Sequence, residues 1–342
     1  MQHHTEKGNV MIPKNIERLR ETLKKTPRDA RWAVIIAPDP DAMASAMAFK
    51  YLIKHRAQSV RIAGSYRVTR PDNLAMIRYL RIPLEPLTPE LRAECTHFAL
   101  VDSQPHHNPA FEDIPFTVVI DHHPVKADAP VTAPFTDIRP SMGAASTIMT
   151  RYIRALRKKP GKLLTTALLY GIRTDTAAFE RGGGADDLNA YQWLSKHADT
   201  AILRRIVRSE YLLEWLPFFS RAFESLQPCR GKGEHAHVGR VDSGDQLVAI
   251  ADFFTRVHGL KWVVVSGVCG NTVIVIFRGD GSHHVGTLAS AGFSDIGSGG
   301  GHHNMARAEF PLHVVGSTSV RDFVFRRLQI RKSRTASAKQ AQ

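Results

Sequence analysis

Three short apolar runs in the first 125 residues are each followed by acidic residues or histidines. The runs are 34–36, 98–101 and 116–120. Each is short enough to be a buried strand, and helix-forming sequence such as Ala42–His55 lies between them. Strands that alternate with helices predict an α/β domain with a mostly parallel sheet and flanking helices. Ligands of such sheets bind at the carboxyl ends of the strands, so the polar residues there are expected to meet.

The polar residues after these runs have the chemistry of a metal site. The candidate ligands are Asp39, Asp41, Asp102, His122 and Asp175, and Asp121 and His123 flank His122. Carboxylate oxygens suit Mg²⁺ and Mn²⁺, and an added imidazole shifts the preference towards Mn²⁺, Co²⁺ or Fe²⁺. Two such ions about 3.5–4 Å apart can activate water and stabilise a phosphoryl displacement. The pattern therefore predicts one convergent metal centre.

Each cluster also has a simpler interpretation when it is taken alone. The run Pro38–Asp41 is typical of a capping turn in which Asp41 is the N-cap of the following helix. Asp102 could cap a loop, Asp175 could be a polar helix end, and the two histidines could lie on the surface. The coincidence of all four clusters at the ends of apolar segments favours the metal site.

Length and composition are those of a soluble protein with two domains. The chain has 342 residues, and no apolar run approaches the ~20 residues that span a bilayer, so no membrane association is expected. The first 20 residues are polar and lack the apolar core of a signal peptide, which predicts a cytoplasmic protein. Three widely spaced cysteines, Cys95, Cys229 and Cys269, are expected to be reduced.

The net charge of +14 favours polyanionic partners such as nucleic acid, nucleotides or polyphosphate. Charge alone is weak evidence, because many basic proteins bind no anion, and part of the excess lies in the terminal residues 331–342. These residues are predicted to be a disordered basic tail.

The chain is expected to divide into a catalytic domain with an N-terminal helix (1–208), a connecting helix and linker (209–234) and a smaller α/β substrate-binding domain (235–330). In the smaller domain, Gly299, Gly300 and Gly301 would let backbone N–H groups approach an anion, and His302 and His303 follow directly. A flexible loop is the alternative for the glycines. Residues 304–307 are predicted as a helix or turn. Arg278 at the end of an apolar run is a candidate phosphate contact, with an exposed rim arginine as the alternative.

These motifs together resemble the DHH phosphoesterase superfamily. The matching residues, in order, are Pro38–Ala42, Val101–Ser103, Asp121–Pro124, Gly143–Thr147, Gly171–Thr176 and, in the C-terminal part, Gly299–Ala306. The resemblance covers residues 30 to 330, and it is strongest for two-domain oligoribonucleases that also act on 3′-phosphoadenosine 5′-phosphate. RecJ-like exonucleases and family II pyrophosphatases are more distant relatives.

The resemblance implies a role for each matched residue. Asp41, Asp102, His122 and Asp175 would hold one Mn²⁺, and Asp39 and Asp102 would hold a second. His123 would contact the scissile phosphate, and Asp121 would orient the motif from behind. Arg278 and the loop from Gly299 to His303 would bind the far end of the substrate. Mg²⁺ or Co²⁺ could substitute for Mn²⁺, and a homodimer is one expected assembly.

One departure from the family pattern concerns Ile35, which stands where relatives have a metal-binding histidine. His106 or His107 could replace it, water could complete the site, or only the better-equipped metal site could fill. The expected function is hydrolysis of short oligonucleotides or of a 3′-phosphorylated nucleotide. The alternatives are an exopolyphosphatase- or pyrophosphatase-like hydrolase and a catalytically weakened module that binds nucleotide or RNA.

Overall fold

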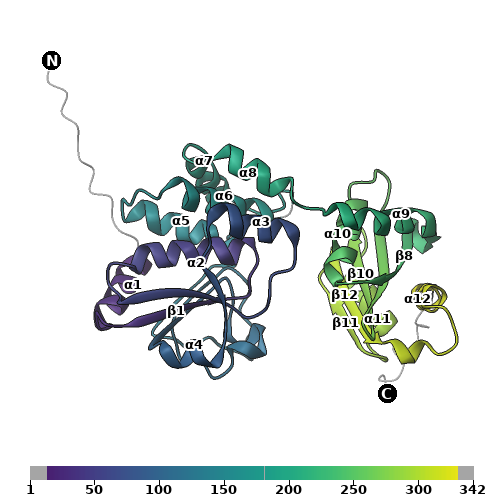
Figure 1. Cartoon of the computed structure of the whole chain (residues 1–342), viewed down its shortest axis with the longest axis horizontal. Coiled ribbons are helices and arrows are strands. Elements are labelled where there is room, and N and C mark those ends of the chain that lie inside the picture. The colour runs from purple at the N-terminus through teal and green to yellow at the C-terminus, as the bar shows by residue number, and fades with distance from the viewer. Residues whose placement is uncertain (1–13, 181, 330–342) are drawn as a thin grey trace, which may run out of the picture. The chain divides into compact units, whose positions relative to one another are not determined.

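The computed structural model describes residues 14–180 and 182–329 (Figure 1). The predicted tail at 331–342 lies outside the described residues. The chain divides between Ser209 and Glu210 into two compact units. Among the described residues, no helix combines the length and the apolarity that a bilayer span requires.

The first unit is built on a six-stranded, wholly parallel sheet. Its strands are β1 (Arg31–Ile36), β2 (Ser59–Gly64), β3 (Leu84–Pro86), β4 (His97–Val101), β5 (Phe116–Asp121) and β6 (Phe135–Ile138), in the order β3-β2-β1-β4-β5-β6. This confirms the predicted fold class. The edge strands β3 and β6 were not predicted, because three or four residues are too few to display a strand period.

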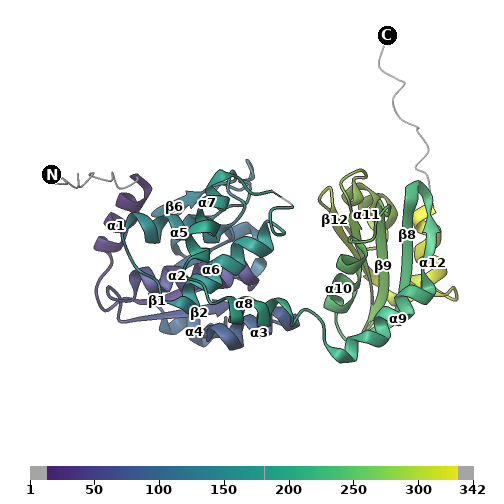
Figure 2. The ribbon, with the colours of Figure 1, turned by 90° about the horizontal axis from the view of Figure 1, so that it is seen from above.

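Helices cover both faces of this sheet. They are α1 (Lys14–Lys25), α2 (Pro40–Ile53), α3 (Pro71–Leu80), α4 (Pro89–Glu94), α5 (Ala145–Ala155), α6 (Lys162–Asp175), α7 (Ala185–Ser195) and α8 (Thr200–Val207), with 3₁₀ turns η1 (Pro105–His107) and η2 (Pro109–Phe111). In Figure 1, α4 lies on the opposite side of the sheet from α1, α2, α5 and α6. Figure 2 shows α2, α5 and α6 as neighbours, and contacts join all three pairs.

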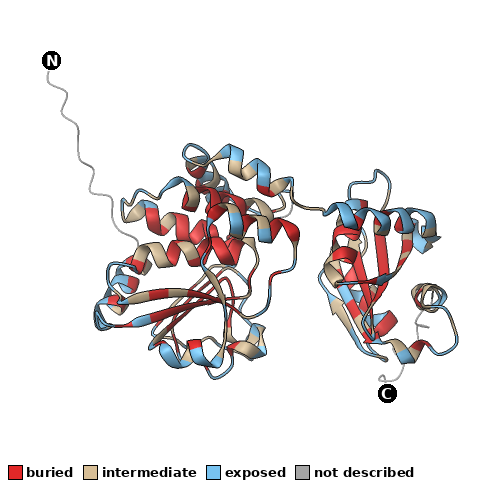
Figure 3. Cartoon of the chain, viewed as in Figure 1, coloured by how far each residue is buried: buried red, intermediate tan, exposed pale blue. Residues whose placement is uncertain are grey.

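The residues of β1 alternate between two cores, as the period of a strand requires. Trp32, Val34 and Ile36 pack with α1, α2, α5 and α6, whereas Ala33 and Ile35 pack on the other face with Leu100 and residues of α4. The buried strands between the helices are red in Figure 3. Ile35, the predicted departure from the family pattern, is a fully buried core residue.

The second unit has a six-stranded mixed sheet. Its strands are β7 (Gln227–Cys229), β8 (Gly233–Val241), β9 (Trp262–Cys269), β10 (Thr272–Gly279), β11 (Ser298–Gly301) and β12 (Met305–Pro311), in the order β11-β12-β10-β9-β8-β7. Only β8 and β9 run parallel among these pairs of described strands. The helices are α9 (Leu216–Ser225), α10 (Gly244–Phe254), α11 (Val285–Phe293) and α12 (Val320–Gln329), with 3₁₀ turns η3 (Leu213–Trp215), η4 (Arg230–Lys232) and η5 (Leu312–Val315). Helices α9 and α10 belong to one core, and α11 and α12 to the other.

Two segments of the second unit differ from the sequence-based expectation. The end of the segment 209–234, expected as a connecting helix and linker, instead forms β7, η4 and the start of β8, and α9 packs on β8 and α10. Residues 304–307, expected as a helix or turn, enter the strand β12, because Ala306, Ala308 and Phe310 alternate into the core. The glycine run pairs with β12 as the edge strand β11.

Candidate metal centre

The candidate centre lies where the order of the first sheet reverses. Strands β1 and β4 are neighbours at the middle of the sheet, and the chain winds outwards from them in opposite directions. Asp39 and Asp41 follow β1, Asp102 follows β4, and His122 follows β5. Open parallel sheets bind ligands in the crevice at such a reversal.

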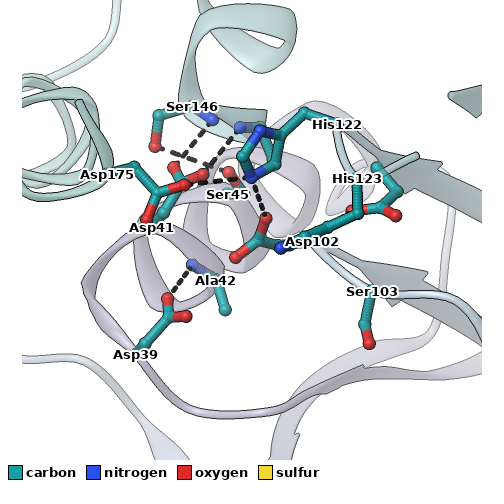
Figure 4. Close-up of polar contacts among 12 residues, drawn as sticks. Asp39, Asp41, Ala42, Ser45, Asp102, Ser103, His122, His123, Ser146 and Asp175 are labelled. Carbon is teal, nitrogen blue, oxygen red and sulfur yellow. Dashed lines mark hydrogen bonds and ion pairs between the residues drawn. The ribbon is translucent and has the colours of Figure 1, made fainter. Parts of the chain in front are cut away.

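Four side chains from different elements converge here. One ligand atom each from Asp41, Asp102, His122 and Asp175 lies within 4.8 Å of all the others. The Nε2 atom of His122 is 3.2 Å from Oδ1 of Asp102 and 3.0 Å from Oδ2 of Asp175 (Figure 4). Asp175 is supplied by the last turn of α6, so a helix as well as the strand ends builds the group.

Backbone groups orient two of these ligands. The amides of Ala145 and Ser146, at the N-terminus of α5, donate to the two carboxylate oxygens of Asp41 at 2.6 and 2.8 Å. The Nδ1 atom of His122 lies 3.2 Å from the carbonyl oxygen of Met142. A carbonyl only accepts, so Nδ1 carries a hydrogen, and Nε2 is the ring atom that faces the carboxylates of Asp102 and Asp175.

The electrostatics of the group are those of a cation-binding site. Burial and the charge of Asp175 raise the pKa of Asp39 to about 7 and that of Asp41 to about 6. Burial and the charges of Asp41 and Asp39 raise the pKa of Asp102 well above its usual value. Burial alone would lower the pKa of His122, but Asp102 and Asp175 outweigh it and raise that pKa to about 12. The carboxylates thus stabilise the protonated ring of His122. A divalent metal ion bound here would offset more of their negative charge.

Two atoms at the centre, both shielded from solvent, have ion-pair contacts but no hydrogen bond of normal geometry. They are Oδ1 of Asp102 and Nε2 of His122. Asp102 also has a positive φ of 60°, which is uncommon for a residue other than glycine. Unsatisfied ligand atoms in a set of three carboxylates and one imidazole fit a divalent cation such as Mn²⁺.

Asp39 has a different position from the other acids. Its Oδ1 atom accepts the backbone N–H of Ala42 at 2.8 Å, so Asp39 is the N-cap of α2 and the prediction of Asp41 as the cap is wrong. Among the described residues, the four-ligand group does not include Asp39. The charges of Asp175 and Asp41 nevertheless add to the effect of burial in raising the pKa of Asp39, so this carboxylate interacts with the group.

His123 and Asp121 form a second pair beside the metal ligands. The Nδ1 atom of His123 donates to Oδ1 of Asp121 at 2.8 Å, and the half-exposed His123 ring lies 4.4 Å from the His122 ring. The other oxygen of the buried Asp121 accepts from Nε2 of Gln104 at 2.8 Å. The hydrogen bond and charge of Asp121 raise the pKa of His123. Sequence analysis missed Gln104, whose position two residues after Asp102 was the available signal.

The histidines considered as substitutes for Ile35 lie after β4. His107 accepts the backbone N–H of Gln104 at 3.2 Å, and its ring lies 5.4 Å from that of His123 and 4.5 Å from that of His106. His107 can form a ligand group with Asp121 and His123. Its contacts are therefore with the Asp121 pair.

The candidate substrate-binding residues lie in the second unit. Arg278 donates to Oδ1 of Asp252 at 2.6 Å and to the carbonyl oxygen of Phe277 at 3.0 Å, so part of its guanidinium is already engaged. Gly299, Gly300 and Gly301 form most of β11. His303 bonds the carbonyl oxygen of Gly281 at 2.6 Å, and His302 is exposed.

Comparisons with known proteins agree with this architecture. Residues 34–172 match the family model "DHH family, N-terminal domain". An uncharacterised protein of Methanocaldococcus jannaschii is 31% identical over 303 residues, which are 87% of this chain and 62% of that protein. The chain therefore spans less than two thirds of the length of this curated relative.

Two solved structures share the fold at low identity. An exopolyphosphatase-related protein from Bacteroides fragilis is 15% identical, with a TM-score of 0.73, and the match covers 94% of this chain and 96% of that one. An exonuclease RecJ bound to manganese is 14% identical, with a TM-score of 0.52, and the match covers 94% of both chains.

Proposed function

We propose that this chain is a metal-dependent phosphoesterase of the DHH family, because residues 34–172 match the model of that family's N-terminal domain. The observation that carries the proposal is the four-ligand group of Asp41, Asp102, His122 and Asp175 with its two unsatisfied atoms. The substrates are short oligonucleotides or a 3′-phosphorylated nucleotide, in keeping with the net charge of +14. The metal is Mn²⁺, and the manganese-bound RecJ of the same fold supports this choice.

The proposed ligand sets follow from the positions of the acids. Asp41, Asp102, His122 and Asp175 would hold one ion, and Asp39 and Asp102 would contribute to a second. A divalent cation here supplies Lewis acidity that makes water a nucleophile at neutral pH and offsets the phosphate charge. Ile35 lies in the apolar core, so the Asp39 side is the less well equipped of the two.

The residues next to the metal ligands would bind the phosphate and protonate the leaving oxygen. His123 presents its free ring edge next to the ligands, and Asp121 holds the ring through Nδ1. The hydrogen bond and charge of Asp121 raise the pKa of His123 and so favour its cationic form, which can contact a phosphate oxygen and donate a proton to the leaving oxygen. Gln104 fixes Asp121 by its amide, so the pair keeps one orientation. In the second unit, His302, His303 and the glycine strand are the proposed substrate-binding residues.

The test is hydrolysis by the purified full chain with Mn²⁺. A short RNA 5-mer, 3′-phosphoadenosine 5′-phosphate, pyrophosphate and polyphosphate are assayed in parallel, with Asp102→Ala as the inactive control. Turnover of the RNA or the nucleotide by the wild type alone supports the proposal. Turnover of pyrophosphate or polyphosphate alone would move the assignment to a phosphoanhydride hydrolase. Equal release by the wild type and Asp102→Ala, or nucleotide binding without turnover, would overturn the enzyme proposal.

A further inference from the structure

The segment Met142–Thr147 orients two of the four candidate metal ligands from outside. The Met142 carbonyl oxygen accepts from His122, and the amides of Ala145 and Ser146 bind both oxygens of Asp41. These contacts set the tautomer of His122 and the rotation of the Asp41 carboxylate. The position of this short segment therefore sets the direction of two metal ligands.

One buried carboxylate from α7 holds this segment on either side of its contacts with Asp41. An oxygen of Asp187 accepts the backbone N–H of Gly143 at 3.0 Å, and the other accepts the hydroxyl of Thr147 at 2.5 Å. The first oxygen also accepts the N–H of Gly184 at 2.8 Å, which ties the start of α7 to the same point. Asp187 is fully buried, so water does not compete for these bonds.

The packing around Gly143 leaves the segment little freedom. A Cβ on Gly143 would lie 2.8 Å from Cγ2 of Thr176 and 3.0 Å from Cα of Gly183. Thr176 directly follows the ligand Asp175, so the segment is in contact with the chain that carries a third ligand. The strands and α6 bring the ligands together, and the segment Met142–Thr147 fixes the orientation of two of them.

We propose that Asp187 is a positioning residue of the metal centre, acting through the segment Met142–Thr147. This inference rests on the proposed metal site and adds a residue that touches neither metal nor substrate. In Asp187→Asn, an amide nitrogen that faces Gly143 and Gly184 leaves both N–H groups without an acceptor, whereas one that faces Thr147 forces that hydroxyl to accept instead of donate. In either case the charge-assisted bonds that hold the segment are lost or weakened. Changes in the direct hydrogen-bond partners of metal ligands typically cost roughly 10- to 100-fold in metal affinity, and Asp187 acts one bond further out, so we expect a loss near the lower end of this range.

The experiment measures Mn²⁺ affinity, by the electron paramagnetic resonance signal of the free ion, in the wild type, Asp187→Asn and Asp186→Asn. Asp186 is the matched control, because it precedes Asp187 in α7 but is exposed and pairs with Arg151. We expect Asp187→Asn to bind Mn²⁺ at least ~10-fold more weakly, and Asp186→Asn to bind like the wild type. Thermal unfolding with and without Mn²⁺ shows whether each variant is folded.

The outcomes separate the two proposals. No Mn²⁺ binding by the wild type would refute the metal site itself. Wild-type affinity in a folded Asp187→Asn, or equal weakening in both variants, would refute the positioning role and leave the metal site standing. If Asp187→Asn does not fold, Thr147→Val decides, because it removes one donor to Asp187. A few-fold loss of affinity there supports the role, and unchanged affinity refutes it.

Discussion

Asp102 has two properties that single it out among the side chains of the centre. It is buried with a positive φ, and one of its oxygens makes no hydrogen bond. Strained backbone and an unsatisfied buried acceptor both cost free energy, so they persist where function requires them. The same residue lies within reach of His122 and raises the pKa of that ring.

We predict that Asp102→Asn weakens Mn²⁺ binding by more than ~100-fold, since even outer partners of metal ligands cost roughly 10- to 100-fold. The metal-free variant should be no less stable than the wild type, because one of several mutually repelling acids is removed. Calorimetric titration and thermal unfolding measure both quantities, with Ser103→Ala as the neighbouring control. Wild-type affinity in Asp102→Asn would contradict the ligand assignment.

The raised pKa values of Asp39 and Asp41 predict how pH acts on the metal-free protein. Their folded-state pKa values of about 7 and about 6 lie above the ordinary 3.8. The folded state thus binds more protons than the unfolded state between pH 4 and 7, and its stability falls as pH rises through this window. Mn²⁺ must displace these protons, so its affinity should rise with pH over the same range. Calorimetric titration with Mn²⁺ at pH 6 in two buffers of different ionisation enthalpy measures the number of protons released. An Mn²⁺ affinity that does not change with pH would contradict this prediction.

Helix α6 reaches the centre because it lacks a side chain where it crosses α2. A Cβ on Gly171 would lie 2.5 Å from Oγ of Ser146 and 3.0 Å from Oδ1 of Asp41. The glycine therefore permits the close approach that brings Asp175, one turn further along α6, to the other ligands.

We predict that Gly171→Ala lowers both stability and Mn²⁺ affinity, because overpacking of this kind typically costs about 1–3 kcal/mol. Gly161→Ala is the matched control at the start of the same helix, where an added Cβ meets nothing within 4 Å. Denaturant unfolding and Mn²⁺ titration are compared for the two variants. Equal behaviour of both would mean that α6 can move without disturbing the ligands.

Across the whole molecule, the two units have separate cores and opposite responses to acid. In the second unit, Oγ of Ser266 bridges Nε2 of the buried His235 at 2.9 Å and Nδ1 of His237 at 3.0 Å. Burial lowers the pKa of His235 to about 3 and that of His237 to about 4. In the unfolded chain these histidines bind protons near pH 6.5, whereas in the folded protein they stay neutral to much lower pH. Their contribution to stability is therefore fully present above pH 6.5 and is lost as pH falls towards 4.

We therefore predict two unfolding transitions in the full chain. Lowering the pH from 7 to 4.5 should lower the transition temperature of the second unit. The loss of its unfolding free energy is at most about 1.4 kcal/mol for each unit of pKa shift. Mn²⁺ should raise only the transition of the first unit. His235→Gln should reduce the acid sensitivity of the second. Calorimetry at several pH values, with and without Mn²⁺, tests these predictions. A single transition whose temperature rises with Mn²⁺ at every pH would contradict the two separate transitions.

Sequence patterns predicted the parallel sheet and most of its helices, because continuous apolar runs such as 98–101 indicate buried strands and Ala42–His55 is rich in helix formers. They did not predict β3, β6 or β11, since none of these strands is a continuous apolar run. The strand β11 depends on its neighbours. A Cβ on Gly299 would lie 2.6 Å from the carbonyl oxygen of Ala289 in α11, so the packing of that helix selects glycine.

The sequence by itself determined which kinds of ligand stand at the ends of which strands, because strand ends and side-chain chemistry are local properties. Only the tertiary structure decided which of these ligands meet. Asp41 joins the four-ligand group, Asp39 caps α2, and Arg278 pairs with Asp252. It also brought in Gln104, whose position two residues after Asp102 was the available signal, and Asp187, which no local pattern indicated. The contact between Gly143 and Asp187 joins residues 44 positions apart, and such contacts depend on how whole helices pack.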